Sequence, residues 1–401
     1  MTINGDLTLN TSAITRIVGA TTFGTAHLAG GGLVSLGFAP GYTLNNTVLF
    51  EGAAAGTRTI EMDGTSGTLT IGAAGVMRTE AGFGGSVLMG GGNNFFGSMT
   101  LVNQGLISSQ TSGRTVTLQP ASLTNQGTLE ASNGGVLSIS SGYTQNAGVT
   151  RVNGGTINSS TINLVAGTLV GTGTINATVN STGIITLDSG GMIVGTLNAT
   201  GGAWNGQGSV SGLATASGGT FTIGSGANMT ANGGLNVTGT GTIAAANGTA
   251  KITGSVSYLS SSNSTFSGII AGAGKTLTMN NEAVTWTLAG ANTYTGTISG
   301  SGGISKTGSG TQTLNALNSY TGTTTVGGGT LRLDFANLAT PTNLLNSSSA
   351  LTLAGGTLSV LGKTGVGVVT SQTLGNVTLT TGTASTPSRS TRTTAVPAAR
   401  R

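Results

Sequence analysis

The sequence predicts an all-β protein, and more narrowly a parallel β-helix, a solenoid whose coils stack on one another. Three observations lead to this prediction. Residues 285–297 (TWTLAGANTYTGT) return 26 positions later as residues 311–323 (TQTLNALNSYTGT), with eight of thirteen positions identical. Glycine-containing turn signals recur about every 20 residues through the middle of the chain, and short alternating strands separate them. Repetition on this scale is typical of solenoids, because each unit buries its apolar face only against its neighbours.

The candidate strands alternate apolar with Thr or Ser side chains and are bounded by Gly, Asn or Ser. In chain order they include residues 59–63, 68–71, 115–118, 136–140, 220–223, 276–279 and 331–335. The turn signals begin at residues 103, 125, 146, 166, 183, 219 and 241. Their uneven spacing is expected where turns change length while strands keep register. We expect no helix longer than two turns, and an irregular loop around Pro341.

The composition restricts the classes of function. Only 6% of the 401 residues are charged, and 73 are glycine. The net charge of +5 comes largely from four arginines after residue 388, so residues 1–380 are close to neutral, and we expect no nucleic-acid partner. Cysteine is absent, which excludes disulfides and Cys-based metal sites. The first residues show no signal peptide, and no apolar run is long enough for a membrane helix.

The duplicated segment has the kernel Asn-x-aromatic-x-Gly, which returns in weaker form elsewhere. We interpret the kernel residues as structural, with the aromatic rings setting coil register by inward or corner stacking. The rings of Phe266, Tyr294 and Tyr320 are expected to form a column, while a carbohydrate-stacking platform with outward Trp204 and Trp286 is the alternative. The structural repeat residues are Asn93, Phe95, Gly97, Phe266, Gly268, Asn292, Tyr294, Gly296, Asn318, Tyr320 and Gly322.

The segment 302–333 (GGISKTGSGTQTLNALNSYTGTTTVGGGTLRL) resembles the autotransporter-associated β-strand repeat of bacterial passenger domains. The match covers the Gly-Gly-Ile-Ser-Lys-x-Gly opening, the Leu-x-x-x-Asn-x-Tyr-x-Gly-x-Thr-x-Val core and the closing Gly-Gly-Thr-Leu. Degenerate copies extend the resemblance to about residues 264–333. The resemblance implies a right-handed β-helix that is exported to the cell surface, with the repeats assisting transport and folding. It also implies an outer-membrane β-barrel translocator, and no segment of this chain has its pattern.

Few residues suggest chemistry. His27, the only histidine, is interpreted as a turn or surface residue. Residues 272–276 (GAGKT) imitate the end of a phosphate-binding loop but precede a strand, so nucleotide binding is not predicted. Glu61 and Asp63 share one face of a strand, as do Arg78 and Glu80 one coil later. We expect Glu61 and Arg78 to form an exposed ion pair rather than part of a catalytic site.

Six Thr-x-Thr pairs raise a further alternative, because a flat threonine array can order water and bind ice. The pairs are Thr68/Thr70, Thr115/Thr117, Thr220/Thr222, Thr276/Thr278, Thr285/Thr287 and Thr311/Thr313. Their intervals are irregular, and ordinary β-propensity explains them. An ice-binding array would require these pairs to align on one flat face.

The sequence therefore predicts regular β-helix coils over residues 1–262, repeat-bearing coils over 263–380, and a disordered basic tail over 381–401. The expected function is a non-enzymatic surface stalk or adhesin-like passenger, without cofactor or metal. Its expected partner is a host-cell surface, the extracellular matrix or a polysaccharide. The alternatives are a polysaccharide-degrading β-helix enzyme, which needs several acids converging in one groove, and the threonine array.

Overall fold

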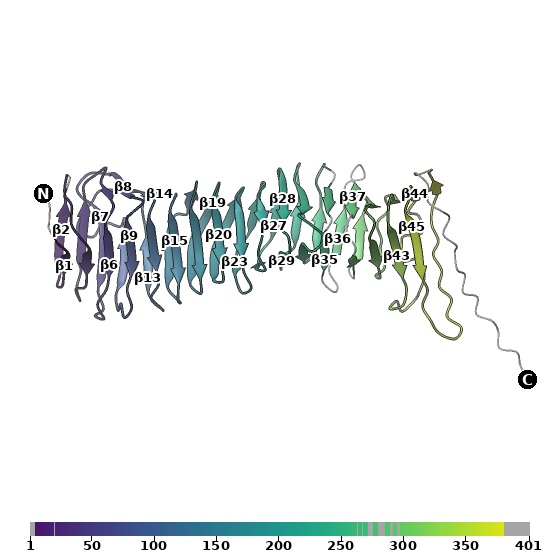
Figure 1. Ribbon diagram of the computed structural model, residues 1–401, viewed down its shortest axis with the longest axis horizontal. Helices are drawn as coiled ribbons and strands as arrows, with labels where there is room; N and C mark the ends of the chain where they lie inside the picture. Colours follow the sequence, from purple (N-terminus) through teal and green to yellow (C-terminus); the bar gives the residue numbers. More distant parts are fainter. Residues whose placement is uncertain are drawn as a thin grey trace, which may run out of the picture.

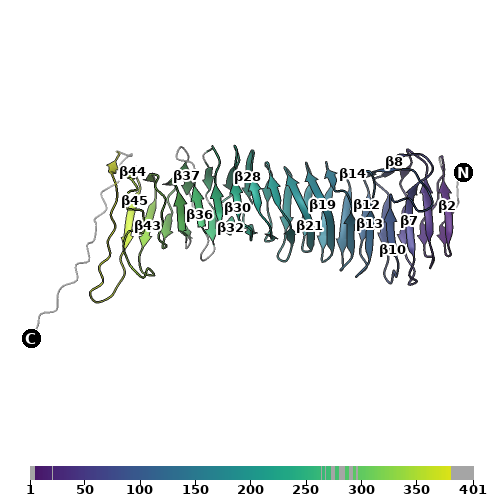
Figure 2. The same ribbon diagram turned by 180° about the vertical axis from the view of Figure 1, so that it is seen from behind.

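The protein is a straight rod of stacked coils (Figure 1, and from behind in Figure 2). The computed structural model describes residues 5–380, except residues 20, 263, 267, 272–275, 280–284, 289–291 and 295–296. The described residues form 46 strands and no helix, and all pairings between these strands are parallel. The predicted parallel β-helix is thus confirmed. The predicted tail over 381–401 lies outside the described residues. No described segment is a helix able to span a membrane.

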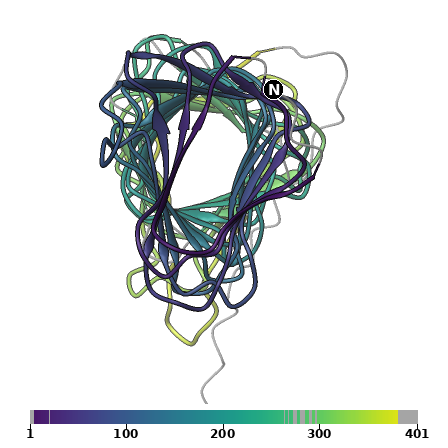
Figure 3. The same ribbon diagram turned by 90° about the vertical axis from the view of Figure 1, so that its left-hand side faces the viewer.

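Each coil runs along three faces, so the rod is roughly triangular when seen from its end (Figure 3). The strands of one face pair with strands of the same face in the next coil. The regular ladder is interrupted on face 1 between β31 (Thr242–Ala245) and β34 (Ser264–Phe266), and on face 2 between β35 (Ile269–Ala271) and β38 (Asn292–Tyr294). In both places the two strands still lie side by side.

Face 1 consists of β1 (Leu7–Leu9), β3 (Ala26–Leu28), β6 (Thr47–Phe50), β9 (Val76–Thr79), β12 (Leu106–Ser109), β15 (Thr128–Ser132), β18 (Val149–Asn153), β20 (Thr168–Gly171), β22 (Ile184–Leu187), β25 (Ala203–Trp204), β28 (Thr220–Ile223), β31 (Thr242–Ala245), β34 (Ser264–Phe266), β37 (Thr285–Leu288), β40 (Gly303–Lys306), β42 (Thr324–Val326), β44 (Leu351–Leu353) and β46 (Val377–Leu379).

Face 2 consists of β2 (Ala13–Ile17), β4 (Val34–Phe38), β7 (Thr57–Met62), β10 (Ser86–Met89), β13 (Thr115–Leu118), β16 (Val136–Ile139), the first halves of β19 (Thr156–Leu164) and β21 (Thr174–Ser181), β23 (Met192–Val194), β26 (Ser209–Val210), β29 (Asn228–Ala231), β32 (Lys251–Thr253), β35 (Ile269–Ala271), β38 (Asn292–Tyr294), β41 (Thr311–Leu314), β43 (Thr330–Asp334) and β45 (Thr357–Leu361).

Face 3 consists of β5 (Thr43–Leu44), β8 (Gly67–Ile71), β11 (Met99–Asn103), β14 (Ser122–Asn125), β17 (Tyr143–Gln145), the second halves of β19 and β21, β24 (Leu197–Ala199), β27 (Ala214–Ala216), β30 (Leu235–Val237), β33 (Val256–Tyr258), β36 (Thr276–Met279) and β39 (Thr297–Gly300).

The number of residues per coil varies, while the strands of successive coils remain paired in parallel. The shortest coils include the one that brings Thr168 beside Ile184. The coils that bring Thr47 beside Val76 and Val76 beside Leu106 are much longer, and their additional residues lie in the connections between strands. The pairing of β32 with β35 and of β33 with β36 runs across residue 262, where the sequence suggested a change of coil type.

Inward side chains from all three faces fill one continuous apolar core along the axis. Every second residue of a strand points inward, and most of these Leu, Ile, Val and Phe side chains are completely buried. Trp204 belongs to this core. It is 0% exposed, and its indole Nε1 donates to the Gly206 carbonyl at 3.1 Å, so the alternative of a carbohydrate-stacking platform with an outward Trp204 is not met. The Trp286 side chain lies outside what the structure describes.

The turn signal Asn-Gln-Gly builds the corner between faces 3 and 1. The buried amide of Asn103 donates to Asn125 at 2.8 Å, and that of Asn125 donates to Gln145 at 3.1 Å, which forms a ladder inside the rod. The exposed Gln104 donates to Gln126 of the next coil at 3.1 Å. The ladder thus joins the two Asn-Gln-Gly signals, and in the next coil its position is taken by Gln145, the residue before the signal Asn146-Ala147-Gly148.

The glycines of this corner form a column in which consecutive coils touch through their backbones. A Cβ at Gly127 would lie 2.3 Å from the Gly105 carbonyl oxygen, and a Cβ at Gly148 would lie 2.1 Å from that of Gly127. Gly167 and Gly202 repeat the arrangement further along the rod. A Cβ at these positions would lie 2.3 Å and 2.2 Å from the carbonyl oxygens of the glycines one coil earlier. A side chain cannot be accommodated so close to a backbone oxygen, so this corner requires glycine.

Candidate functional site

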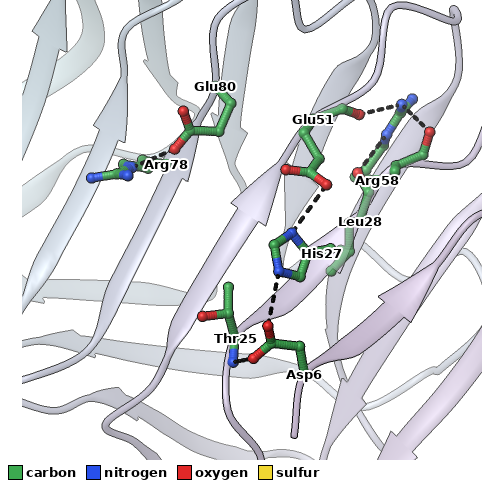
Figure 4. A network of polar contacts seen from close by, with 9 residues as sticks. Asp6, Thr25, His27, Leu28, Glu51, Arg58, Arg78 and Glu80 are labelled. Carbon is green, nitrogen blue, oxygen red and sulfur yellow. Dashed lines mark hydrogen bonds and ion pairs between the residues drawn. The ribbon is translucent and has the colours of Figure 1, made fainter.

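The N-terminal third of faces 1 and 2 carries most of the charged side chains that the structure describes. His27 lies on β3 and points out of face 1, between carboxylates of the two flanking coils (Figure 4). Its Nδ1 is 3.1 Å from Glu51 Oε1, and its Nε2 is 3.6 Å from Asp6 Oδ2. Asp6 also accepts the Thr25 backbone N–H at 2.7 Å. The carboxylates contact opposite sides of the ring, an arrangement that ties three coils together.

Further along face 1, ion pairs continue this polar surface. Arg78 Nε is 2.7 Å from Glu80 Oε1, and both side chains are partly exposed. Glu130 accepts the Ser108 hydroxyl at 2.9 Å, and its Oε1 lies 3.8 Å from Arg151 Nη1 on the next coil. Partly exposed pairs of this kind contribute at most about 1 kcal/mol each to stability.

Glu61 does not belong to this surface, and the predicted ion pair between Glu61 and Arg78 is wrong. Glu61 lies on β7 in face 2, whereas Arg78 lies on β9 in face 1. The prediction assumed that one coil of average length would stack these two residues, but Arg78 instead stacks on Leu49 and Ser108. Because the coils in this region are longer than average, less than one full coil separates Glu61 from Arg78, and they lie on different faces.

The Glu61 carboxylate is buried beneath residues 90–98, which we call the covering loop. Glu61 is 1% exposed, and its Oε2 accepts the backbone N–H groups of Asn93, Asn94 and Phe95 at 3.0, 2.9 and 2.8 Å. Its Oε1 accepts the Thr59 hydroxyl. The Ser35 hydroxyl also donates to Oε1, at 3.4 Å. Together these five donors make charge-assisted hydrogen bonds that offset the cost of burying the charge.

The covering loop packs tightly on the outer surface of face 2. Phe95 is buried, and a Cβ at Gly37 of β4 would lie 2.7 Å from its ring, so β4 needs a glycine there. The Arg16 guanidinium lies over this ring, 5.4 Å from its centre, and its Nε is 3.2 Å from Asp63 Oδ1. As a result, β4 and β7 are buried on both surfaces, unlike most strands of the rod.

The acids that could have served a glycosidase are thus distributed over two faces and are individually engaged. Glu61 is inaccessible, Asp63 contacts Arg16, and Glu80 contacts Arg78. In the described part of the chain, no group of three or more His, Cys, Asp or Glu side chains could hold a metal ion. The loop-like sequence at residues 272–276 falls largely outside the described residues.

The kernel around Asn318 replaces a strand on face 3, between β41 and β42. The Asn318 Oδ1 accepts the Ile298 N–H of the preceding coil at 2.9 Å. Its Nδ2 and its backbone N–H both donate to the Leu344 carbonyl of the following coil, at 3.1 and 2.8 Å. One asparagine side chain therefore connects three coils. Gly322 is required by a close approach, because a Cβ there would lie 2.4 Å from the Gly302 carbonyl.

The earlier kernel copies have different surroundings. Asn93 is exposed and uses its backbone, whereas Phe95 is buried, and a Cβ at Gly97 would lie 2.4 Å from the Thr65 carbonyl oxygen. Phe266 is a buried residue of β34, and a Cβ at Gly268 would lie 2.4 Å from the Ala250 carbonyl oxygen.

The register of the coils does not stack the kernel aromatics on one another. Phe266 pairs with Leu288, and Tyr294 pairs with Leu314, so the expected column of Phe266, Tyr294 and Tyr320 does not form. Asn292 lies in β38 on face 2 and not opposite Asn318, because the coil that brings Asn292 beside Gln312 is shorter than the period of the sequence repeat. Gly296 and the side chains of Asn292 and Tyr294 lie outside the described residues.

Two buried cations were not recognised from the sequence. Arg58 is fully buried and donates to the carbonyls of Leu28 and Glu51 at 3.2 and 2.8 Å (Figure 4). Its guanidinium also lies 5.0 Å from the Phe83 ring centre. Lys306 is also buried and donates to the carbonyls of Thr307 and Gly308. Burial lowers the pKa of both groups. Each cation satisfies carbonyl oxygens at a coil corner, a role that alternating patterns do not reveal.

Tyr320 predicts a measurable pH dependence of stability. Burial raises its pKa above the ordinary value of 10.0, and the opposing effect of its hydrogen bond to Thr324 is smaller. The neutral phenol is therefore favoured in the folded chain. Its contribution to stability is complete below pH 10 and is lost above it, at up to about 1.4 kcal/mol per pH unit. We expect Tyr320→Phe to lose less stability between pH 8 and pH 11 than the wild type in urea denaturation.

The matched control for Tyr320→Phe is Thr324→Val. This substitution removes the same hydrogen bond but keeps the phenol, so it should retain the alkaline loss. An unchanged pH dependence in Tyr320→Phe would contradict the assignment.

The threonine pairs do not align on one flat face. Thr68/Thr70 and Thr276/Thr278 are on face 3, Thr115/Thr117 and Thr311/Thr313 on face 2, and Thr220/Thr222 and Thr285/Thr287 on face 1. The condition for the ice-binding alternative is therefore not met by these pairs.

Comparison with known proteins finds a family match within the C-terminal coils. Two adjoining segments, residues 285–303 and 304–333, match the model of the passenger-associated-transport-repeat family. Neither a curated protein nor a solved structure matches the chain. The matched residues form the coils from β37 to β43, so the repeat is part of the solenoid itself. The predicted passenger-type repeat is confirmed, and together with the β-solenoid it supports an autotransporter passenger that is exposed outside the cell.

Proposed function

We propose that the chain is a non-enzymatic stalk with an adhesin-like role, exported as a passenger to the surface of a bacterial cell. The observation that carries this proposal is the passenger-associated-transport-repeat within an unbroken stack of coils. A continuous parallel solenoid extends in one direction, and neighbouring coils supply each other's stability. Such a rod can hold a binding surface away from the membrane.

The surroundings of the acidic residues support a role without catalysis. A glycosidase requires two carboxylates on either side of a sugar bond, one of them with a raised pKa. The Glu61 carboxylate is buried and accepts five hydrogen bonds, three of them from the covering loop, so it is not accessible to a substrate. Asp63, Glu80 and Glu130 contact Arg16, Arg78 and Arg151. Asp6 and Glu51 contact the two ring nitrogens of His27.

Surface display tests the proposal directly. Residues 1–380 are placed between an export signal and an outer-membrane β-barrel translocator in a Gram-negative host, and surface exposure is measured by antibody labelling and protease accessibility of intact cells. We expect display of the wild-type segment, and at least fivefold less display when residues 285–333 are deleted. A control deletion of similar length, residues 184–234, removes the strands from β22 to β29 outside the matched repeat and should reduce display less. Retention of the wild-type segment inside the cell would refute the proposal.

A further inference from the structure

Face 3 differs from the other two faces because its strands carry no charged residue from β5 to β39 in the described part of the chain. One outward position is paired through thirteen successive coils by the register of these strands. Its residues are Thr43, Thr70, Val102, Thr124, Thr144, Asn163, Asn180, Asn198, Thr215, Asn236, Ser257, Thr278 and Ser299. Twelve of the thirteen are Thr, Asn or Ser, and none is buried. We call this row the neutral column.

The neutral column contains an amide ladder at its centre. Asn180 Nδ2 donates to Asn163 Oδ1 at 2.8 Å, and Asn198 Nδ2 donates to Asn180 Oδ1 at 2.9 Å. Each primary amide has two donors and an oxygen with two lone pairs. The ladder therefore orients three amides in one direction along the rod and leaves hydrogen-bonding capacity for a ligand.

A groove of about 450 Å³ lies along this ladder. The turns that follow the face 3 strands form one wall, with Val165, Thr182 and Thr200 exposed on it. Its lining is Thr144, Asn163, Leu164, Val165, Asn180, Ser181, Thr182, Asn198 and Thr200, which includes no charged and no aromatic residue. The size is within the usual range for small-ligand sites, roughly 300–1,000 Å³.

We propose that this groove binds a neutral oligosaccharide segment whose chain lies along the rod axis. Sugar hydroxyls both donate and accept, as do the amides and hydroxyls of the groove. Adjacent coils present these groups about 4.8 Å apart, a repeat that an extended glycan can follow over several sugars. A charged ligand gains nothing here, because it would lose hydration without meeting an opposite charge. The inference builds on the proposed function by naming the class of ligand and its site.

The test is binding of defined oligosaccharides to the isolated full chain, measured by saturation-transfer NMR and isothermal titration calorimetry. The probes are neutral linear tri- to hexasaccharides of glucose, galactose, mannose and N-acetylglucosamine, and sulfated or uronate-containing oligosaccharides of equal length. We expect at least one neutral series to bind, and the charged probes to bind at least tenfold more weakly. No binding of any neutral probe at millimolar concentration, or equal binding of the charged probes, would overturn the proposal.

Variants locate the site. Asn180→Leu should weaken binding at least tenfold, because it interrupts the ladder in the groove. Asn176→Leu is the matched control, since Asn176 lies in the same strand, donates to Asn158 at 2.6 Å, and is on face 2 outside the groove. It should change affinity less than twofold. Thr200→Glu, on the exposed rim, tests the site without interrupting the ladder and should also weaken binding at least tenfold. Circular dichroism verifies folding of each variant.

Two outcomes would assign the result differently. Equal weakening by Asn180→Leu and Asn176→Leu would show that binding does not depend on the groove. If the wild-type chain self-associates and Asn180→Leu is monomeric, face 3 would be an interface between two copies of the chain. That outcome would overturn the glycan assignment. The isolated chain needs no export for these measurements, so failure here leaves the proposed function standing, and failure of surface display leaves this test interpretable.

Discussion

Replacing Glu61 by Ala is expected to destabilise the N-terminal coils by about 3–5 kcal/mol. The substitution removes the acceptor for the N–H groups of Asn93, Asn94 and Phe95 and leaves them without a partner under the covering loop. The loop would then separate from face 2 and expose Phe95. Hydrogen–deuterium exchange should show faster exchange in residues 90–98 and in β4 and β7, with the coils beyond residue 200 unchanged, because solenoid stability is local.

Two substitutions make this result specific. Glu80→Ala removes a partly exposed carboxylate from a nearby ion pair and should cost less than about 1 kcal/mol. Glu61→Gln retains one oxygen for the backbone donors and should cost less than Glu61→Ala. If Glu61→Ala and Glu80→Ala had equal effects, the buried carboxylate would not be what holds the covering loop.

Gly127→Ala should be the second severe substitution, with a loss of about 3 kcal/mol in the free energy of local unfolding. Its new Cβ would lie 2.3 Å from the Gly105 carbonyl oxygen, so the corners of two coils must move apart. The backbone ladder and the Asn103–Asn125 ladder pass through this corner and would be strained with it. Urea denaturation and exchange of the amides of residues 103–130 measure the effect.

Gly218→Ala is the matched control for this substitution. No atom lies within 4 Å of a Cβ built at Gly218, and its backbone does not have a positive φ. Removing a glycine from such a position stabilises a protein slightly or leaves it unchanged. A loss in Gly218→Ala equal to that in Gly127→Ala would mean that chain flexibility, and not the contact between coils, explains the glycine content.

The architecture could be predicted because local patterns determine most of it. Alternating strands predicted the inward and outward surfaces, and the recurring Asn-Gln-Gly turn identified the corner where a side-chain ladder and a glycine column coincide. Gly105 and Gly127 are separated by one coil, so the interval between such signals gives the coil length. The passenger-type repeat was also recognisable, because its residues form contiguous coils.

The errors arise where coils depart from the average length. The coils that follow β6 and β9 are much longer than the average, which moved Arg78 away from Glu61 and provided the chain for the covering loop. Alternation cannot show that a loop folds back on a distant strand, so Glu61 was expected to be solvated. The neutral column was missed for a related reason: its members are unevenly spaced along the chain, and only the strand register aligns them.

The parallel register gives the rod a fixed pitch that is independent of how much chain each turn consumes. The short turn from Thr168 to Ile184 and the long turn from Val76 to Leu106 both raise the stack by one strand spacing, about 4.8 Å. Long coils widen the rod and short coils use fewer residues, while the length of the rod depends only on the number of coils. Inserting or deleting whole coils would therefore change the length of the rod in equal steps.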